Sequence, residues 1–271
     1  MDYLRTEITE EIDCTDNRWD SPWFFLDDQI FVSASFDSQV NSGPIRKNSG
    51  IPTSNGISGS YSRFGQYKDY LYCIDNTTLH PFRVSNPSCP VALDAVPIGW
   101  NIETIFPWEN HLFIGSQTGL IVFNASNPEQ PSYEASFIHA TGCDPVVCDE
   151  NYAYVTIHAG TTCNGTLNQL DVIDIKNLPT TSLTQSYSMT KPQGLSVAGN
   201  YLYLCDDGLK VYDKTKPESL KLLAHLRDIE TYDALLVDDT HLMVIGADGF
   251  YQYDVSDPTS PKKISHIKVT P

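Results

Sequence analysis

Short apolar runs alternate with tight turns along most of this chain, and the same order of run, turn, run and proline returns several times. The segment YLYCIDNTTLHPFRVSNPSCP, which begins at Tyr70, has a counterpart in HLFIGSQTGLIVFNASNPEQP, which begins at His111. Short apolar runs bounded by Gly, Asn and Pro are typical of β-strands. The pattern therefore predicts an all-β protein built from one repeated unit.

The repeated unit has a nearly constant length. Its central apolar residue, which we call the anchor, lies in triplets such as YLY, HLF and YAY, and successive anchors are 41, 41, 41, 49 and 40 residues apart. The anchors are Ile30, Leu71, Leu112, Ala153, Leu202 and Leu242. A period of this length with several short strands per repeat is typical of a β-propeller blade. We expect a β-propeller of six four-stranded blades, with seven as the rival count if the alternating segment LRTEITEEI belongs to a further blade.

We expect residues 1–271 to form a single domain with two irregular stretches. Residues 37–60 are rich in Ser, Gly and Asn, which predicts a long surface loop and makes the first blade degenerate. In the unit anchored at Ala153 the punctuating Pro179 comes late, and the additional residues fall in HAGTTCNGTLNQ. This predicts an inserted hairpin loop over residues 158–168.

The net charge of −17 restricts the partners of the protein. It argues against a nucleic-acid partner, because phosphate binding requires clustered Lys and Arg. No run of about 18 apolar residues exists, so we expect no transmembrane segment. The start MDYLRTEITEEID has neither a basic region nor an apolar core and is not a signal peptide. A cytosolic protein and an exported protein whose leader was removed both stay open.

The chain has none of the common catalytic motifs. GxSxG, HExxH, the phosphate-binding P-loop and GxGxxG are absent, and none of the seven histidines has the spacing of a metal-ligand pair. We therefore predict no catalytic residue, no cofactor and no metal site. An enzyme stays open as an alternative, because propeller enzymes assemble their sites from separate loops.

A row of polar residues stands nine positions before each anchor. Its members are Ser21, Ser62, Glu103, Asp144, Gln193 and Asp233. Two positions later stands a row of apolar residues, which are Trp23, Phe64, Ile105, Val146, Leu195 and Leu235. In a propeller this segment is the innermost strand, so the polar row is predicted to surround one mouth of the central channel.

The polar row has two interpretations. Together with Arg63, Trp100 and the loop at residues 158–168, it can bind a small polar ligand or a protein partner. Alternatively, its side chains only satisfy backbone groups and water at a solvated rim.

Several segments resemble a known family. GLKVYDKTKP and YQYDVSDPTSP resemble the LVIVD-repeat β-propellers of bacteria, and SGSYSRF, GWNIETIF and NQLDVIDI resemble a group of exported Bacteroidetes lipoproteins of unknown function. The resemblance covers most of the chain from Ser58 onward. It implies a β-propeller, a location in the cell envelope or outside the cell, and a lipid anchor in the full-length form. The chain departs from the group in lacking the lipobox leader and one N-terminal blade.

Seven cysteines are present, and one pair is a candidate disulfide. Cys143 begins a predicted inner strand, and Cys163 lies in the inserted loop at the same end of the hairpin, so a Cys143–Cys163 bond would tie this loop down. The exported character that the resemblance implies favours it. Cys73, Cys148 and Cys205 lie within predicted strands and are expected to be small buried hydrophobic residues.

The preferred function is a non-catalytic binding or scaffolding module of the cell envelope, with docking at the channel mouth. The first alternative is a hydrolase or lyase that acts on a carbohydrate or lactone through paired carboxylates at this mouth, such as Glu103 and Asp144. The second is a structural repeat domain of a larger assembly. The sequence leaves the oligomeric state open.

Overall fold

The computed structural model describes residues 25–26, 29–30, 58–138, 145–159 and 166–269. The chain divides into two compact units, Met1–Gly50 with Pro87–Cys89, and Ile51–Asn86 with Pro90–Pro271. In the first unit the described strands are β1 (Phe25–Leu26) and β2 (Gln29–Ile30), which pair antiparallel with Phe25 opposite Ile30. The other strands of the structure belong to the second unit.

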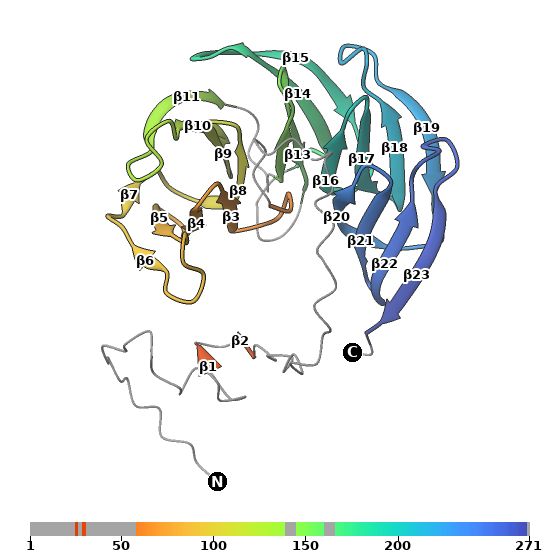
Figure 1. Ribbon diagram of the computed structural model, residues 1–271. Coiled ribbons are helices and arrows are strands. Elements are labelled where there is room, and N and C mark those ends of the chain that lie inside the picture. The colour runs from red at the N-terminus through yellow and green to blue at the C-terminus, as the bar shows by residue number, and fades with distance from the viewer. Residues whose placement is uncertain (1–24, 27–28, 31–57, 139–144, 160–165, 270–271) are drawn as a thin grey trace. The chain divides into compact units, whose positions relative to one another are not determined.

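In the described part of the second unit, five antiparallel sheets follow one another along the chain (Figure 1). The first contains β3 (Phe64–Tyr67), β4 (Tyr70–Ile74) and β5 (Thr78–Arg83), followed by the short strands β6 (Val91–Ala92) and β7 (Val96–Pro97), which both pair with β5. The second contains β8 (Ile102–Trp108), β9 (His111–Ser116), β10 (Gly119–Asn124) and β11 (Ser132–Ile138).

The remaining three sheets have four strands each. The third contains β12 (Val146–Cys148), β13 (Tyr152–Ile157), β14 (Gln169–Asn177) and β15 (Thr180–Ser188). The fourth contains β16 (Pro192–Ala198), β17 (Tyr201–Asp206), β18 (Leu209–Asp213) and β19 (Lys221–Leu226). The fifth contains β20 (Thr231–Asp238), β21 (His241–Gly246), β22 (Gly249–Asp254) and β23 (Lys262–Lys268).

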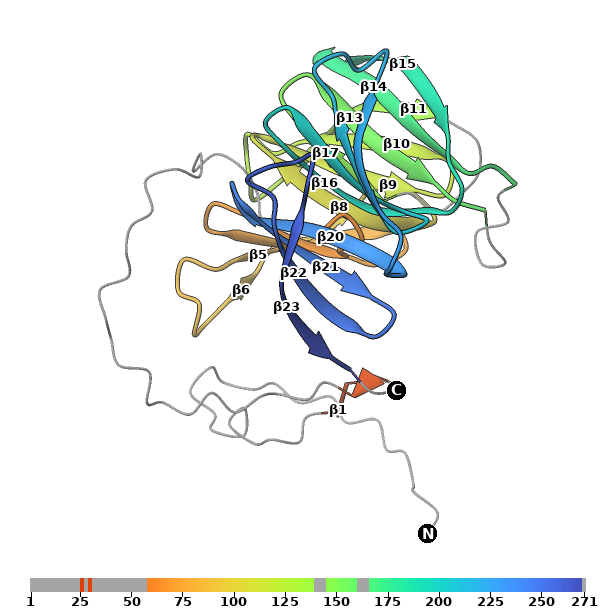
Figure 2. The same ribbon diagram turned by 90° about the vertical axis from the view of Figure 1, so that its right-hand side faces the viewer.

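The first strands of the five sheets lie innermost and contact one another in chain order, β3 with β8, β8 with β12, β12 with β16, and β16 with β20. Figure 1 has the outer strands β11, β15, β19 and β23 at the periphery, and Figure 2 has β8, β16 and β20 close together in the middle. The predicted all-β propeller architecture is therefore confirmed. The predicted count of six blades is not matched, because the described residues form five.

The hydrophobic core lies between neighbouring sheets. Because side chains alternate along a strand, each anchor faces the preceding sheet and the residue after it faces the following sheet. Tyr72 packs in one cluster with Leu112, and Tyr203 packs in another with Leu242. Phe113 with Ala153 and Tyr154 with Leu202 repeat this contact at the two interfaces between them. Burying each large apolar side chain contributes roughly 1.5–3 kcal/mol, so these interfaces provide most of the stability of the fold.

Two of the proline turns are hydrogen-bonded to a tyrosine of the preceding sheet. Tyr72 donates its hydroxyl hydrogen to the backbone carbonyl of Pro128 at 2.9 Å, and Tyr187 donates to that of Pro217 at 2.7 Å. Both prolines follow the third strand of the next sheet. These two prolines of the repeat therefore mark inter-sheet contacts as well as turns.

One predicted alignment is wrong by a single residue. In β20, Leu236 pairs with Leu242 and Asp238 pairs with His241, so Val237 is an additional, bulged residue. The bulge shifts every residue of β20 before Val237 by one position relative to the other inner strands. Ala234, which lies opposite Val244, therefore takes the buried position predicted for Leu235. The other sheets keep the predicted spacing, with Ile105 opposite Ile114 and Leu195 opposite Leu204.

The segment Ser58–Ser60 lies among the inner strands. Ser58 donates its hydroxyl hydrogen to the carbonyl of Ile105 at 2.8 Å. Ser60 Oγ lies 2.7 Å from Asp233 Oδ1, to which it donates, and accepts the backbone N–H of Leu195 at 2.9 Å. Three consecutive small residues therefore contact β8, β16 and β20 at the axis of the molecule.

The last residues of the surface loop predicted for residues 37–60 do not lie on the surface. Ser58 and Ser60 are buried, and residues 37–57 lie outside the described part of the chain. Small residues are needed here because little space is left. A Cβ atom on Gly59 would lie 3.0 Å from the Asp233 carboxylate. The inserted loop lies between Ile157, where β13 ends, and Gln169, where β14 begins, and its residues 160–165 are not described.

Candidate functional site

The inner strands β3, β8, β16 and β20 all begin at the same end of the sheets, which we call the entry face. Because the second strand of each sheet runs antiparallel to the first, its last residues reach this face as well. Arg63, Glu103, His158, Lys191 and Glu230 all stand at such strand starts and ends. The entry face therefore gathers charged side chains from five successive repeats.

A pocket of about 360 Å³ opens on this face between the first and second sheets. Its size lies at the lower end of the range for small-molecule sites. Tyr61, Arg63 and Asn76 come from the first sheet and the segment before it, and Asn101, Glu103 and Gln117 come from the second. The pocket thus combines one guanidinium, one carboxylate, three amides and one phenol ring.

Hydrogen bonds hold the two charged groups of the pocket in place. Arg63 Nη2 donates to Asn76 Oδ1 at 2.9 Å, and Gln117 Nε2 donates to Glu103 Oε1 at 2.9 Å. The backbone joins the two walls, because the N–H of Ile102 donates to the carbonyl of Asn76 at 3.1 Å. No ion pair between Arg63 and a carboxylate occurs within the described residues. The guanidinium therefore keeps donors for a bound molecule.

The charge of Glu103, which lines this pocket, acts on the imidazole of His158. Burial lowers the pKa of its imidazole, the positive charge of Lys191 lowers it further, and Glu103 opposes both effects. The buried Nδ1 of His158 has no hydrogen-bond partner among the residues that the structure describes. An imidazole with a lowered pKa is neutral at pH 7 and can accept a proton or a hydrogen bond.

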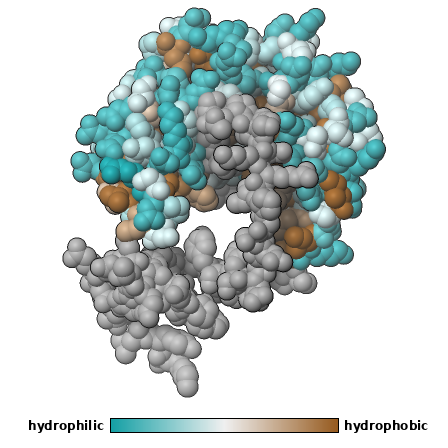
Figure 3. Space-filling view, viewed as in Figure 1, coloured by the Kyte–Doolittle hydropathy of each residue, from teal (hydrophilic) through white to brown (hydrophobic). Residues whose placement is uncertain are grey.

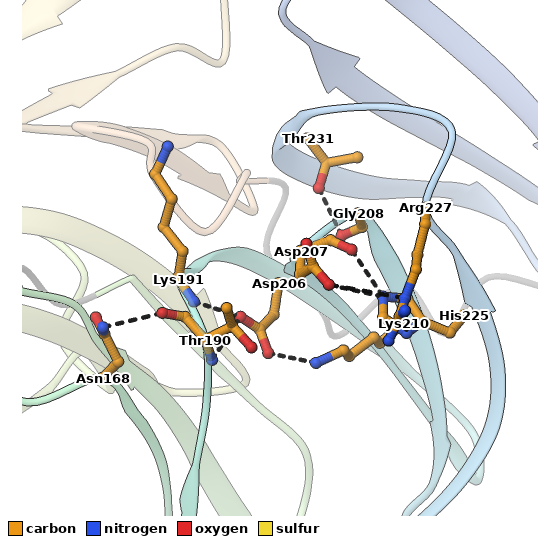
Figure 4. A network of polar contacts seen from close by, with 10 residues as sticks. All are labelled: Asn168, Thr190, Lys191, Asp206, Asp207, Gly208, Lys210, His225, Arg227 and Thr231. Atoms are coloured by element: carbon orange, nitrogen blue, oxygen red, sulfur yellow. Dashed lines mark hydrogen bonds and ion pairs between the residues drawn. The ribbon is translucent and has the colours of Figure 1, made fainter.

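The position of Lys191 is set by a buried carboxylate. Asp206 is fully buried, and its Oδ1 accepts the backbone N–H groups of Thr190 at 3.0 Å and Lys191 at 2.6 Å. Its other oxygen accepts from Lys210 Nζ at 2.6 Å. Figure 4 shows the Lys191 side chain extending away from this network. It reaches Glu230, where Lys191 Nζ donates to Oε1 at 3.3 Å.

The residues predicted for the site fall into three groups. Arg63 and Glu103 lie together in the pocket, whereas Trp100 is 80% exposed outside its lining. Ser62 Oγ lies against the backbone of Phe64, and the carbonyl of Gln193 accepts from Thr156 Oγ1 at 2.7 Å. Ser21, Asp144, Cys143 and Cys163 lie outside the described residues.

Asp233 occupies a different place from the one expected. The bulge in β20 moves it one position inward, so its carboxylate faces Ser60 and Gly194 at the axis rather than the pocket. Burial raises its pKa, whereas hydrogen bonds from Ser60, Ala234 and Tyr61 act in the opposite direction.

Sequence reasoning missed Asn76, Asn101 and Gln117. Asn76 and Gln117 lie in the turns that follow the anchor strands, and Asn101 directly precedes an inner strand. The alternating strand direction within each repeat was the available signal, because it brings these turns to the end where the inner strands start.

The described cysteines behave in two ways. Cys73, Cys148 and Cys205 are unpaired, and the last two are buried in strands, as predicted. Burial raises the pKa of both buried thiols, so they are unreactive. Cys89 is disulfide-bonded, which the sequence did not predict.

The described residues include neither a cluster of metal-binding side chains nor a membrane-spanning helix. They contain no group of three or more His, Cys, Asp or Glu side chains arranged to hold a metal ion. Among the same residues, no helix has the length and apolar character needed to cross a membrane.

Comparison with known proteins supports the fold. Residues 191–222 match the LVIVD repeat. The structure is similar to a functionally unknown protein from Desulfotomaculum acetoxidans, with a TM-score of 0.60, 8% identity, and coverage of 80% of this chain and 70% of that one. A protein from Lactobacillus plantarum gives a TM-score of 0.57 and 14% identity, with 75% and 69% covered.

A third similar structure is the periplasmic gluconolactonase PpgL of Pseudomonas aeruginosa. It gives a TM-score of 0.56 and 12% identity, with coverage of 74% of this chain and 68% of that one. Comparison with functionally curated proteins gives no match. At these identities the likeness establishes the β-propeller fold alone.

Proposed function

We propose that this protein is a non-catalytic binding module that holds a small polar ligand in the pocket of the entry face. One observation carries the proposal. The pocket places the Arg63 guanidinium and the Glu103 carboxylate in one cavity, each fixed by an amide side chain. Few, convergent, oriented polar groups in a concave site are the usual features of a small-molecule site.

The lining suits a polyhydroxylated ligand such as a sugar. Arg63 and the amide groups of Asn76 and Asn101 supply donors, and Glu103 supplies an acceptor, so ring hydroxyls would meet both kinds of partner. The exposed ring of Tyr61 offers an apolar surface for the C–H face of a sugar. Charge-assisted hydrogen bonds to Arg63 and Glu103 would provide most of the specificity.

The same proposal includes a location outside the cytoplasm. Structural disulfides persist in oxidising compartments, and the bond at Cys89 supports export to the cell envelope. The match to the LVIVD repeat agrees with the resemblance to exported bacterial propellers, from which the lipid anchor is also proposed.

Isothermal titration with a panel of neutral, acidic and amino sugars tests the binding function. We expect one class to bind, and Arg63→Ala to weaken its affinity at least tenfold, which corresponds to about 1.4 kcal/mol. Arg227→Ala is the matched control, because this exposed arginine lies outside the pocket. Binding by no compound, or equal loss in both variants, would contradict the proposal.

The alternative function is hydrolysis or elimination on a carbohydrate or lactone. It is favoured by His158, whose lowered pKa provides a neutral proton acceptor that the charge of Glu103 acts on. If a compound that binds is also turned over, and Glu103→Gln abolishes this turnover but keeps the binding, then the protein is an enzyme and not a binding module.

A further inference from the structure

The pocket of the entry face holds two opposite charges that do not pair with each other. Arg63 and Glu103 line the same cavity of about 360 Å³, and no ion pair joins these two described side chains. Each is hydrogen-bonded to an uncharged amide, Arg63 to Asn76 and Glu103 to Gln117, both at 2.9 Å. Opposite charges in one cavity attract each other, so contacts with the amides keep them apart.

One short backbone segment fixes both amides. The carbonyl of Asn76 accepts the N–H of Ile102 at 3.1 Å, and the N–H of Gln117 donates to the carbonyl of Asn101 at 3.1 Å. Ile102 is 1% exposed and belongs to the core cluster shared by the first two sheets. Because both amides are tied to Asn101–Ile102, the separation of the two charges is set before a ligand binds. Such pre-organisation lowers the entropic cost of binding.

Other charges near these turns have partners of their own. Asp75 accepts two backbone N–H groups of its own turn at 2.7 Å, and one of its oxygens lies 3.1 Å from His80 Nε2. Lys191 Nζ donates to Glu230 Oε1 at 3.3 Å. None of these four residues belongs to the lining of the pocket. A ligand in the pocket therefore meets one positive and one negative group.

This pair of charges decides which ligand charges fit. One guanidinium and one carboxylate give the lining no net charge. A ligand with only a carboxylate gains a charge-assisted hydrogen bond from Arg63 but also approaches Glu103, and a ligand with only an ammonium group has the reverse problem. A neutral ligand takes water from both charges and offers neither an opposite charge. A molecule with one carboxylate and one ammonium group satisfies both.

The character of the surrounding surface makes the arrangement of charges important. The described residues on the face drawn in Figure 3 are mostly hydrophilic, and the hydrophobic ones lie in separate patches. Polar groups are therefore common on this protein, and a polar lining alone would select little. Two opposite charges at a fixed separation select a ligand by its charge pattern.

We propose that the ligand of this pocket is a small zwitterion, whose carboxylate binds Arg63 and whose ammonium group binds Glu103. The inference rests on the binding function proposed above, because it concerns the same site. Sugars that carry both an amine and a carboxylate have this chemistry, and so do free α-amino acids. The amides of the lining supply further hydrogen bonds to hydroxyl groups, which favours the sugar.

Isothermal titration with three sugars of matched structure tests the inference. Muramic acid carries an ammonium group and a carboxylate on one sugar. N-acetylmuramic acid keeps the carboxylate but loses the ammonium charge, and glucosamine keeps the ammonium group but lacks the carboxylate. Muramic acid is expected to bind at least tenfold more tightly than either of the others, which corresponds to about 1.4 kcal/mol. Alanine represents the free α-amino acids.

Two variants that each remove one charge assign the two groups. Glu103→Gln keeps an oxygen for Gln117 but loses the negative charge. The preference for muramic acid over N-acetylmuramic acid should therefore disappear in it, whereas the preference over glucosamine should survive. Arg63→Gln should show the reverse pattern. Arg227→Gln and Glu218→Gln are the controls, because both residues are exposed and lie outside the lining, and all affinities should stay unchanged.

The possible failures are distinguishable. If N-acetylmuramic acid or glucosamine binds as tightly as muramic acid, and Arg63→Ala still weakens this binding, the zwitterion is wrong and the binding function stands. If the preference over N-acetylmuramic acid survives in Glu103→Gln, the acetyl group acts by its size and the role of Glu103 is overturned. If no compound binds, the binding function fails together with the inference. Tighter binding of alanine, with the same dependence on both charges, supports the zwitterion and assigns it to amino acids.

Discussion

At the scale of single residues, two carboxylates of β20 illustrate how position determines protonation. Asp233 is partly buried at the axis, and its burial raises its pKa. Asp238 is exposed at the turn of the same hairpin, where hydrogen bonds from the backbone of Thr240 and from His241 lower its pKa to about 2. One strand therefore carries two carboxylates with opposite effects on stability.

These shifts predict opposite effects of pH in two variants. The lowered pKa of Asp238 stabilises the fold above the unfolded pKa of about 3.9, and this contribution is lost as the pH falls towards 2. Asp238→Asn should therefore reduce the free energy of unfolding at pH 7, by less than about 1 kcal/mol because solvent screens the exposed group. The difference from the wild type should vanish near pH 2.

Asp233→Asn should act in the other direction. A raised pKa means that the folded state holds its proton more tightly than the unfolded state, so ionisation at neutral pH costs stability. The amide retains an acceptor for Ser60, so the variant should equal or exceed the wild type at pH 7. This advantage should disappear as the pH falls below about 3.9, where the wild-type group is protonated in both states. Urea unfolding from pH 2 to 7 measures both effects, and parallel pH profiles would contradict them.

At the scale of the elements, a buried ion pair joins the third and fourth sheets. Lys214, after β18, donates to Asp149 in the turn before β13, and only 8% of the lysine side chain and 20% of the carboxylate are exposed. The same carboxylate accepts the backbone N–H groups of Asn151 and Tyr152. The pair therefore fixes the turn of one sheet against the third strand of the next.

Lys214→Met should destabilise the protein by about 1.5–3 kcal/mol, the range for hydrogen bonds to charged groups, because the carboxylate would keep its place without its cation. Lys176→Met is the control, since Lys176 pairs with Asp174 on the surface of a single sheet and should cost less stability than Lys214→Met. Thermal unfolding monitored by circular dichroism compares them. Equal shifts in the two midpoints would mean that the inter-sheet pair has no special role.

The strands also show which features the sequence could predict and which it could not. Strand order and sheet composition follow from the period of the anchors, because every repeat buries equivalent residues against its neighbours. The bulge at Val237 has no such signal, since one added residue leaves the alternation on either side intact. For this reason Asp233 was assigned one position away from its true place.

At the scale of the whole molecule, the axis is filled rather than open. Ser58–Ser60 contacts β8, β16 and β20, and Ser60 reaches Asp233, 173 residues away in the sequence. Periodicity could not predict this contact, because it joins a segment outside the repeat pattern to three separate repeats. The centre therefore acts as packed core, and the pocket for a ligand lies to one side, between two sheets.

Gly194 tests this packing most directly. A Cβ atom on it would lie 2.0 Å from Asp233 Oδ1 and 2.7 Å from Asp233 Cα, so Gly194→Ala must push β16 and β20 apart at the axis. We expect a loss at the upper end of the roughly 1–3 kcal/mol range for overpacked cores, measured by urea unfolding. Gly199→Ala is the control, because its positive φ of 50° strains alanine although nothing lies within 4 Å, and it should cost only about 1–2 kcal/mol.

A double variant separates the two sources of the clash at Gly194. Asp233→Ala removes the carboxylate but leaves Cα in place, so it should recover only part of the stability lost in Gly194→Ala. Complete recovery would mean that the side chain alone fills the axis and that the backbones of β16 and β20 have room to spare. No loss in Gly194→Ala at all would contradict a packed axis and leave an open channel as the centre of the molecule. Partial recovery with a single unfolding transition is the outcome we expect, because sheets joined through one packed centre unfold together.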